Sequence, residues 1–272
     1  MKFSVLMSVY YKENPLFFDE ALRSIMIEQT IIPDEFVLVC DGALNSELNC
    51  IIEKYYTLFP EIVKVYRLET NVGLGKALAY GLEKCTYEVV ARADSDDVCD
   101  KYRFEKQIRF IEEHKEVSAV GSDIDEFNDN YENPIRFKHM PQDFSDIKKV
   151  SRYRNPINHM TVMFYKTPIL SVGSYIDLPF VEDYYLWVRL IAHGYVITNI
   201  REVLVHARVG NGMVKRRGNK KYISSWKVLN QYKLSCCQIN RFEYIINLLL
   251  VRMFVYLPSF VKNITYKRIL RN

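Results

Sequence analysis

The sequence predicts an α/β fold with a mainly parallel sheet that is covered by helices on both faces. The first observation is that apolar runs of strand length alternate with amphipathic helical segments along the first 122 residues, which is the pattern of a parallel sheet. The second is the composition: 49% of the 272 residues are hydrophobic and 14% are aromatic, enough for a sizeable core. The chain is long enough for one large domain or for one domain with an appendage.

The strands and helices are predicted in order from apolar runs and from helix-start signals. Five runs are predicted as strands: Phe3–Val9, Glu35–Cys40, Val63–Leu68, Tyr87–Ala91 and Val117–Ser122. Asn14 and Pro15 suit the N-cap and first turn of a helix, and Asp100 suits the N-cap of another. Three helices are predicted between the strands, over Pro15 to about Gln29, Ser46–Leu58 and Asn71 to about Lys84, and a fourth follows Asp100.

Three carboxylates, Asp94, Asp96 and Asp97, follow the fourth predicted strand within four positions. Burying like charges this close is unfavourable unless a cation or hydrogen-bond donors compensate them. Carboxylates at the C-terminal end of a strand suit a hard divalent ion that also binds phosphate oxygens. The simpler alternative is an acidic turn that caps the next helix.

Other polar groups are expected to meet these carboxylates, because ligands of parallel sheets bind beyond the C-terminal strand ends. Tyr10, Tyr11 and Asp41 follow the first two strands. Gly73–Lys76 is a glycine-bearing helix start that either faces a pyrophosphate through Lys76 or forms a flexible turn. A P-loop is excluded because its first glycine and final Ser/Thr are missing, and no GxGxxG follows the first strand.

Charge and cysteine content indicate where the protein works. Residues from Lys215 onward carry 13 Lys/Arg and one acid, Glu243, whereas the first 214 residues carry 24 bases and 32 acids. Such a basic tail indicates contact with an anionic surface. The six cysteines form no CxxC pair, which favours free thiols in a reducing cytosol over a disulfide or zinc scaffold. Met1-Lys2 leads directly into a strand, so no signal peptide is expected.

Several blocks, in order along the chain, resemble those of family 2 glycosyltransferases, which are inverting, nucleotide-sugar-dependent enzymes of the GT-A fold. The blocks are Ser4–Tyr10, Asp41-Gly42, Asn71–Leu74, Ala91–Asp97, Val181–Trp187 (similar to the ED-x-x-LW block) and Arg208–Gly210 with Arg216–Gly218. The last resembles a block of bacterial enzymes that build O-antigen and exopolysaccharide. Two departures matter: Cys40 stands where many members have an aspartate, and the Q-x-x-R-W block of processive members is absent before Trp226. The second departure indicates transfer of one sugar per acceptor.

The resemblance implies roles for the donor-side residues. Tyr10 and Asp41 would hold the uracil or another base, and Asp94 would reach the ribose. Asp96 would bind Mn²⁺ or Mg²⁺, which neutralises the charge that grows on the leaving nucleoside diphosphate. Lys76 and Arg92 are candidate helpers at the phosphates, although Arg92 could simply balance the acids.

On the acceptor side, Asp183 is the residue expected to act as general base and to deprotonate the attacking hydroxyl. Glu182, Trp187 and His159 are expected to line the acceptor and donor pocket, and His206 to complete the metal shell. For each there is a structural alternative: Glu182 and Asp183 also suit a helix N-terminus, and a lone histidine is more often structural.

The sequence also predicts the division of the chain. Residues 1–218 would form the GT-A catalytic domain, with a Rossmann-like nucleotide-sugar half to about residue 122 and an acceptor half over 123–218. Residues 219–272 would form a basic, amphipathic helical tail. The apolar stretch Tyr244–Leu257 is too short to span a membrane, so the tail would either lie on anionic lipid or pack on the catalytic domain.

Together these expectations predict one function, and three alternative functions stay open. The predicted enzyme is cytoplasmic and peripheral at the inner face of the cell membrane, where it transfers a sugar from a UDP-sugar to a glycan, most simply a lipid-linked one. No nucleic-acid partner is expected. The alternatives are a nucleotidyltransferase acting on sugar phosphates, a nucleic-acid-binding protein that uses the basic C-terminus, and a non-catalytic sugar-nucleotide binder.

Overall fold

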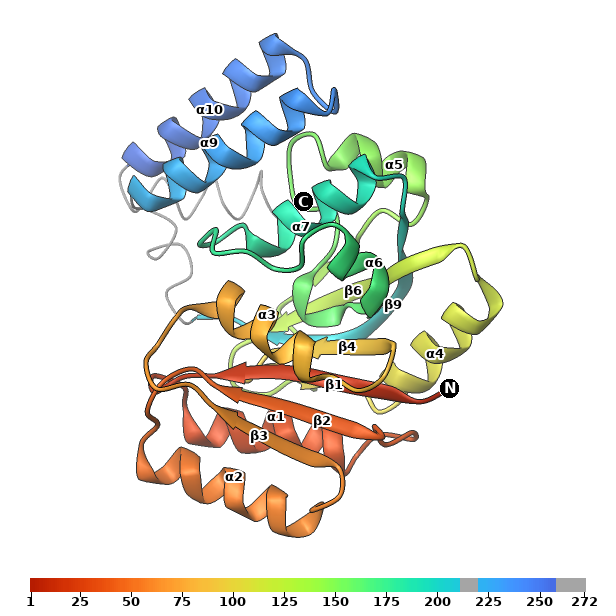
Figure 1. Cartoon of the computed structure of the whole chain (residues 1–272), viewed down its shortest axis with the longest axis vertical. Coiled ribbons are helices and arrows are strands. Elements are labelled where there is room, and N and C mark those ends of the chain that lie inside the picture. The colour runs from red at the N-terminus through yellow and green to blue at the C-terminus, as the bar shows by residue number, and fades with distance from the viewer. Residues whose placement is uncertain (211–219, 258–272) are drawn as a thin grey trace.

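A computed structural model describes residues 1–210 and 220–257, whose strands form one continuous sheet (Figure 1). The block Arg216–Gly218, the predicted boundary at residue 218 and the basic residues after position 257 lie outside the described residues. The strands are β1 (Phe3–Val9), β2 (Glu35–Cys40), β3 (Val63–Arg67), β4 (Val89–Ala93), β5 (Val98–Cys99), β6 (Val117–Phe127), β7 (Arg136–Lys138), β8 (Met163–Tyr165) and β9 (Val196–Arg208). The strand order is β3-β2-β1-β4-β8-β6-β9-β5, with β7 paired to β6.

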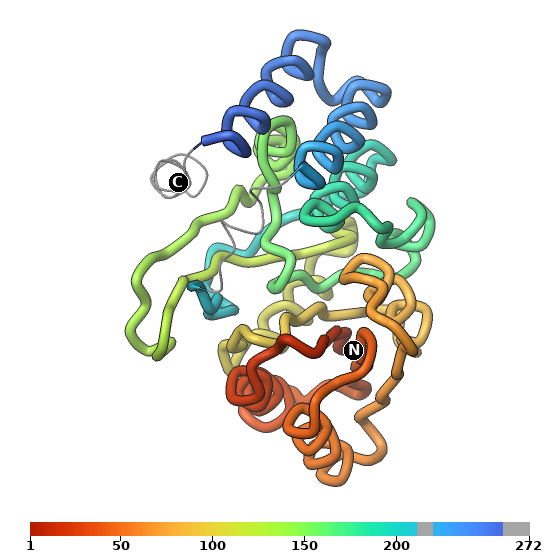
Figure 2. The backbone as a smooth tube through the Cα atoms, turned by 90° about the vertical axis from the view of Figure 1, so that its left-hand side faces the viewer, coloured from red at the N-terminus to blue at the C-terminus, as the bar shows by residue number. Residues whose placement is uncertain are grey.

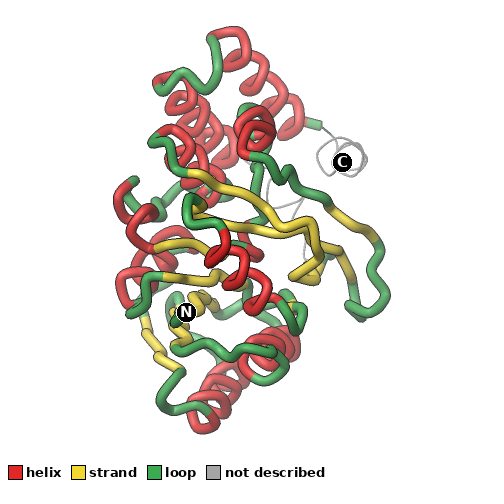
Figure 3. Tube along the Cα trace, turned by 90° about the vertical axis from the view of Figure 1, so that its right-hand side faces the viewer, coloured by secondary structure: helices red, strands yellow, loops and turns green. Residues whose placement is uncertain are grey.

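Helices cover both faces of this sheet, as Figure 3 shows with helices on either side of the strands. They are α1 (Pro15–Met26), α2 (Ser46–Leu58), α3 (Leu74–Lys84), α4 (Arg103–Glu113), α5 (Phe144–Val150), α6 (Lys166–Ser171), α7 (Glu182–Ala192), α9 (Lys220–Ser235) and α10 (Arg241–Tyr256), with a 3₁₀ turn at His159–Thr161. One buried apolar cluster packs α1, α2 and α4 on the sheet, and a second packs α3, α6 and α7 on it. The predicted mixed, mainly parallel α/β architecture is confirmed.

The first four strands bring the predicted ligand-binding ends together. β1 pairs in parallel with β2 and β4, so that Val9 lies beside Cys40 and Met7 beside Ala93. The residues that follow these strands, Tyr10, Asp41 and Asp94, therefore lie at one edge of the sheet. This convergence is the one that parallel topology predicts.

The rest of the sheet joins the second half of the chain to the first. β8 runs antiparallel to both β4 and β6, and β9 runs parallel to β6. The expected division near residue 122 falls inside β6, so both halves share that strand. The end of β9 returns the chain to the turn that follows β4, because β5 pairs with β9 at Val98 and His206.

Two local predictions are wrong. The helix after the acidic cluster has its N-cap at Tyr102 and not at Asp100. Asp100 instead accepts a hydrogen bond from the Tyr102 amide at 2.9 Å, so it closes the turn before the helix. The fourth strand spans Val89–Ala93 and not Tyr87–Ala91, because its parallel register with β1 pairs Phe3 with Val89 and Met7 with Ala93. The six cysteines are free, as predicted.

The last two helices form a hairpin that packs on the acceptor half (Figures 1 and 2). A third apolar cluster joins this hairpin to α7 through Tyr184 and Val188 of α7, Tyr222 and Leu229 of α9, and Phe254 of α10. The fold therefore places the hairpin directly on the helix that carries Asp183.

Candidate active site

The aspartates after β4 form a compact cluster of carboxylates. One oxygen from each of Asp94, Asp96 and Asp97 lies within 4.8 Å of the others. Burial, and then the charges of Asp96 and Asp94, raise the pKa of Asp97 well above its usual value. Such mutual repulsion is relieved by a cation, and oxygen ligands alone suit Mg²⁺ or Mn²⁺. The residues present therefore fit a divalent cation.

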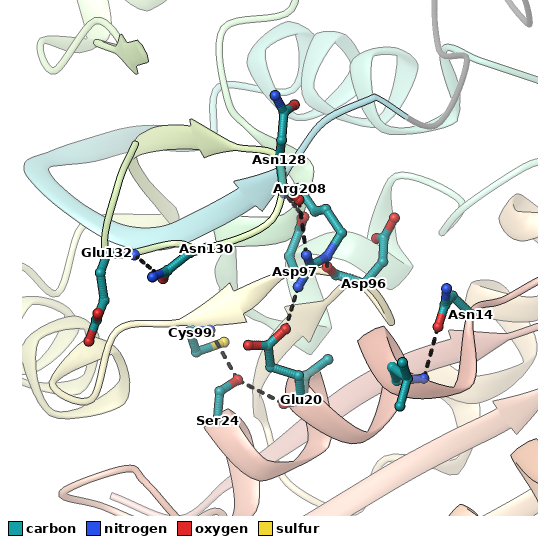
Figure 4. Close-up of polar contacts among 12 residues, drawn as sticks. Asn14, Glu20, Ser24, Asp96, Asp97, Cys99, Asn128, Asn130, Glu132 and Arg208 are labelled. Atoms are coloured by element: carbon teal, nitrogen blue, oxygen red, sulfur yellow. Dashed lines mark hydrogen bonds and ion pairs between the residues drawn. The ribbon is translucent and has the colours of Figure 1, made fainter. Parts of the chain in front are cut away.

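Arg208, at the end of β9, fixes the acidic turn from the other side of the sheet (Figure 4). Its amide donates to Asp97 Oδ1 at 2.8 Å and its Nε donates to the carbonyl of Asp96 at 3.1 Å. Its Nη2 also pairs with Glu20 of α1. Arg208 thus ties the turn to both halves of the molecule, a positioning role that the sequence indicated only as part of a family-like block.

Arg92 is buried, pairs with one aspartate of the cluster and lies within electrostatic range of Asp183. Its Nη2 pairs with Asp94 Oδ1 at 2.5 Å. Burial opposes its charge, but Asp94, then Tyr175 and Asp183, raise its pKa overall. Its Nε and Nη1 have no hydrogen-bond partner among the described residues. Because an unsatisfied buried donor is destabilising, these two nitrogens mark a place where a polar ligand group would bind favourably.

Asp183 lies in the first turn of α7, as predicted, and its carboxylate is held in a defined orientation. Asn155 Nδ2 donates to Asp183 Oδ2 at 2.6 Å, and the Tyr184 amide donates to Asp183 Oδ1 at 2.7 Å. Asp183 and Asp94 both act electrostatically on Arg92 and on the Tyr175 hydroxyl. Asp183 and Asp94 therefore both lie within electrostatic range of the same two buried groups, although 86 positions separate Asp183 from Asp97 in the sequence.

The partly buried His159 and the buried Tyr175 lie next to each other. His159 Nε2 lies 3.0 Å from the Tyr175 hydroxyl. Burial, and then the charge of Arg92, hold the pKa of His159 well below its usual value, so the imidazole is neutral at pH 7. Glu182 lies beside Asp183 at the start of α7 and is largely buried.

Trp187 does not line an open surface. Its side chain is fully buried in the core cluster of α3, α6 and α7. Its ring meets that of His159 edge-on at 6.2 Å between centroids. The apolar spacing that helped to identify α7 already placed Trp187 on the core-facing side, so it supports the histidine from behind.

The residues expected at the nucleotide are spread along the same sheet edge but differ in exposure. Tyr10 is partly exposed and packs edge-on against Tyr11. Asp41 is buried, and its two oxygens accept hydrogen bonds from the amides of Val72 and Gly73 at 2.7 and 3.0 Å. Asp41 thus holds the turn that begins α3.

Lys76, in the first turn of α3, contacts the acceptor half. Its Nζ lies 2.9 Å from Asp177, and both side chains are exposed. Next to it, a Cβ on Gly75 would lie 2.3 Å from the carbonyl oxygen of Ile176, so only glycine allows this approach. The start of α3 therefore packs against the loop that leads into α7.

The prediction that His206 joins the metal shell is not met. Its Nδ1 lies 2.8 Å from Asp125 Oδ1, and Tyr131 packs against its ring. Among the described residues, the group of side chains close enough to share a cation contains Asp94, Asp96 and Asp97 and not His206. The pairing of β9 with β6 sets this position, because it brings His206 opposite Asp125.

Comparison with known proteins identifies this arrangement. The model of the family described as "Glycosyl transferase family 2" matches residues 4–173. The chain is 39% identical over 266 residues to the amylovoran biosynthesis glycosyltransferase AmsE of Erwinia amylovora, covering 98% of each chain. It is 38% identical over 271 residues to the UDP-Gal:α-D-GlcNAc-diphosphoundecaprenol β-1,3-galactosyltransferase of Escherichia coli, covering 99% of this chain and 97% of that one.

A solved structure supports the fold. The S. aureus TarS 1–349 structure in complex with UDP-GlcNAc aligns with a TM-score of 0.69 at 20% identity, covering 99% of this chain and 76% of that one. The fold is that of the GT-A glycosyltransferases. By family model, relatives and fold, the chain belongs to glycosyltransferase family 2, and it is a glycosyltransferase.

Proposed function

We propose that the protein transfers one sugar from a UDP-sugar, with inversion, to a hydroxyl group of a lipid-linked glycan. The observation that carries the proposal is the shared site: Asp94 and Asp183, from opposite halves of the chain, both act on the buried Arg92. A donor-binding carboxylate and a base must lie on either side of the anomeric carbon for an inverting displacement. The nucleotidyltransferase, non-catalytic and nucleic-acid-binding alternatives find no such support in this geometry.

The donor side would bind the nucleotide diphosphate. Tyr10 would stack on the base, while Asp41 holds the adjoining turn at Val72 and Gly73. Asp94 would reach the ribose, and Lys76 would approach the phosphates by exchanging its exposed contact with Asp177. A divalent cation bound by Asp96 and its neighbours would act as a Lewis acid at the diphosphate.

The acceptor side would carry out the proton transfer. The acceptor oxygen attacks the anomeric carbon while the bond from that carbon to the diphosphate oxygen breaks, and the bonding electron pair leaves with the diphosphate. Asp183 takes the hydroxyl proton on a carboxylate oxygen. Asn155 keeps that carboxylate oriented, and Arg92 remains protonated between Asp183 and Asp94.

The remaining donors of Arg92 and the neutral His159 would contact sugar hydroxyls. Arg92 Nε and Nη1 are buried without a partner among the described residues, and His159 lies within the electrostatic reach of Arg92. Hydrogen bonds to donor or acceptor hydroxyls would satisfy these groups. Glu182, next to the base, would border the acceptor.

The relatives indicate the biological setting of the reaction. AmsE acts in amylovoran biosynthesis, and the E. coli relative uses UDP-Gal and a diphosphoundecaprenol-linked acceptor, according to their names. We therefore propose a role in bacterial surface polysaccharide synthesis at the inner face of the cell membrane. UDP-galactose is the first donor to test, and a GlcNAc-diphospho-lipid is the first acceptor.

The proposal can be tested with purified protein, a panel of nucleotide sugars and that acceptor, with UDP release and product linkage as the readouts. We expect UDP release to require acceptor and to stop when EDTA removes divalent cations. An Asp183→Asn variant should bind donor but not turn it over. Release of pyrophosphate, or turnover that is unaffected by Asp183→Asn, would contradict the proposal.

A further inference from the structure

Helix α10 presents a continuous apolar surface on its outer side. Six large apolar side chains there are each between 51% and 71% exposed: Phe242, Ile245, Leu249, Leu250, Met253 and Tyr256. Their spacing of three and four residues places them along one side of the helix. We call this set the α10 stripe.

The stripe is a defined surface, because the opposite side of α10 is firmly packed. Glu243 pairs with Arg152 and accepts a hydrogen bond from Tyr153, and Asn247 donates to the Arg152 carbonyl at 2.9 Å. Val251 and Phe254 are buried in the cluster shared with α7 and α9. The helix therefore cannot turn the stripe inward without losing these contacts.

The exposed charged side chains of the described hairpin are positive. Arg241 and Arg252 are exposed on α10, three helical turns apart, and both project at the same border of the stripe. Lys220, Lys221 and Lys227 are exposed on α9. The one acid after Lys215, Glu243, is buried against Arg152, and its contacts there lower its pKa to about 2 although burial opposes this. In sequence, residues 258–272 add four bases and no acid.

We propose that the α10 stripe is a docking surface for an anionic lipid membrane and lies in the interface between headgroups and acyl chains. A helix with an apolar side bordered by arginines has the chemistry of an interfacial membrane helix. A second copy of the chain is a poorer occupant, because two basic hairpins would repel each other. Among residues 1–210 and 220–257, no helix has the length and apolarity needed to cross a bilayer.

The hairpin also supports the helix that carries the candidate base. Lys233 of α9 is fully buried, and its Nζ donates to the Tyr184 hydroxyl at 2.6 Å. The Tyr184 hydroxyl in turn donates to the carbonyl of Ser151 at 2.7 Å, and Tyr184 follows Asp183 directly. Docking of α10 would thus hold α7 and Asp183 close to the membrane, where a lipid-linked acceptor resides. This last step rests on the proposed function.

Vesicle flotation of the full chain tests the surface. The probes are vesicles of phosphatidylcholine alone and of phosphatidylcholine mixed with phosphatidylglycerol. We expect binding to the anionic vesicles, an affinity at least about tenfold weaker for Leu249→Gln/Met253→Gln, and loss of the anionic preference in Arg241→Gln/Arg252→Gln. The matched control is Leu16→Gln/Leu58→Gln, which removes two exposed leucines from α1 and α2 and should bind as the wild type does.

Two outcomes would overturn the inference. The first is that the wild type and the Leu249→Gln/Met253→Gln variant bind vesicles with equal affinity, or that neither binds, while circular dichroism shows that both are folded. The other is a stable wild-type dimer in sedimentation velocity that this variant dissolves, which would make the stripe a protein interface. A transfer assay with a water-soluble acceptor separates the two proposals. The Leu249→Gln/Met253→Gln variant should keep its transferase activity in this assay. If the wild type itself transfers no sugar, the proposed function is contradicted, but the proposed membrane surface is not.

Discussion

The two carboxylate groups of the site are built in opposite ways. After β4, Asp94, Asp96 and Asp97 crowd within 4.8 Å, and their repulsion and burial raise the pKa of Asp97. On α7, the carboxylate of Asp183 is oriented by an amide side chain and by one backbone amide. Crowded oxygens suit a cation, whereas one oriented carboxylate suits a proton. The difference teaches that charge density, not residue type, separates the two proposed roles.

The largest effect is expected when one charge is removed from the aspartate cluster after β4. Asp96→Asn should lower kcat/KM by about 10⁴-fold, since cation binding and diphosphate neutralisation are lost together. Activity would be measured against added Mn²⁺, and excess cation should restore part of it. Asp97→Asn is the matched control: its amide oxygen can still accept from the Arg208 amide, so we expect a loss of at most about tenfold. Equal losses in both variants would contradict distinct roles within the cluster.

Removing the charge of Asp183 should lower kcat without affecting donor binding. Asp183→Asn should lower kcat by about 10³-fold and leave the dissociation constant of the UDP-sugar unchanged, because only proton transfer is impaired. Rapid-quench kinetics and calorimetric donor binding measure the two quantities. Weakened donor binding with little change in kcat would place Asp183 on the donor side and break the comparison.

A substitution of Arg92 should affect both the donor-side aspartates and the candidate base Asp183. Arg92→Lys keeps the charge but removes the planar fork that reaches Asp94, so we expect about a hundredfold lower kcat/KM, divided between kcat and donor KM. Steady-state kinetics with donor and acceptor varied separately would show this division. A change confined to one constant would mean that Arg92 serves one carboxylate only.

The smallest expected effect is on stability. It tests whether the buried Lys233 of the hairpin destabilises the packing against the acceptor half. Burial lowers the pKa of Lys233 to about 7 in the folded protein, with Cys236 opposing. Between that value and its unfolded pKa of 10.5, the unfolded chain binds a proton that the folded chain does not, so stability rises with pH. From pH 7 to 8.5 the gain should approach about 2 kcal/mol.

Urea unfolding at the two pH values measures that gain, and Lys233→Met should abolish it. The raised pKa of the buried Tyr184 hydroxyl keeps it protonated over this range. Cys236 also has a raised pKa in the folded protein, so its thiol loses its proton first in the unfolded chain and opposes a small part of the gain. A wild-type stability that is flat or falls over this interval would show that the amine keeps its proton. Its contacts with the rings of Tyr184 and Trp226 would then be the stabilising force.

Much of the fold followed from local patterns in the sequence. The strands Phe3–Val9 and Glu35–Cys40 were predicted to the residue and the helix Ser46–Leu58 approximately, because apolar runs and caps are local signals. The expectation that Asp183 meets the aspartates came from the order of family-like blocks. It could not come from spacing, since the antiparallel insertion of β8 between β4 and β6 brings these segments together.

The features that the sequence did not predict share one physical cause. They depend on which residue a side chain contacts in the folded chain. His206 pairs with Asp125 because of the register of β9 with β6. The roles of Arg208 and Asn155 arise from contacts across long sequence distances. The outward direction of the α10 stripe likewise required knowing which side packs on α7.

The passage of β6 through the expected boundary at residue 122 has a mechanical consequence. A strand hydrogen-bonded within one sheet resists hinge bending, so we expect the two portions that share β6 to move together as one rigid frame. We expect movement around substrates to be confined to the connecting segments outside the sheet. Engineering of sugar preference should accordingly target those segments, since remodelling the frame would disturb both substrates at once.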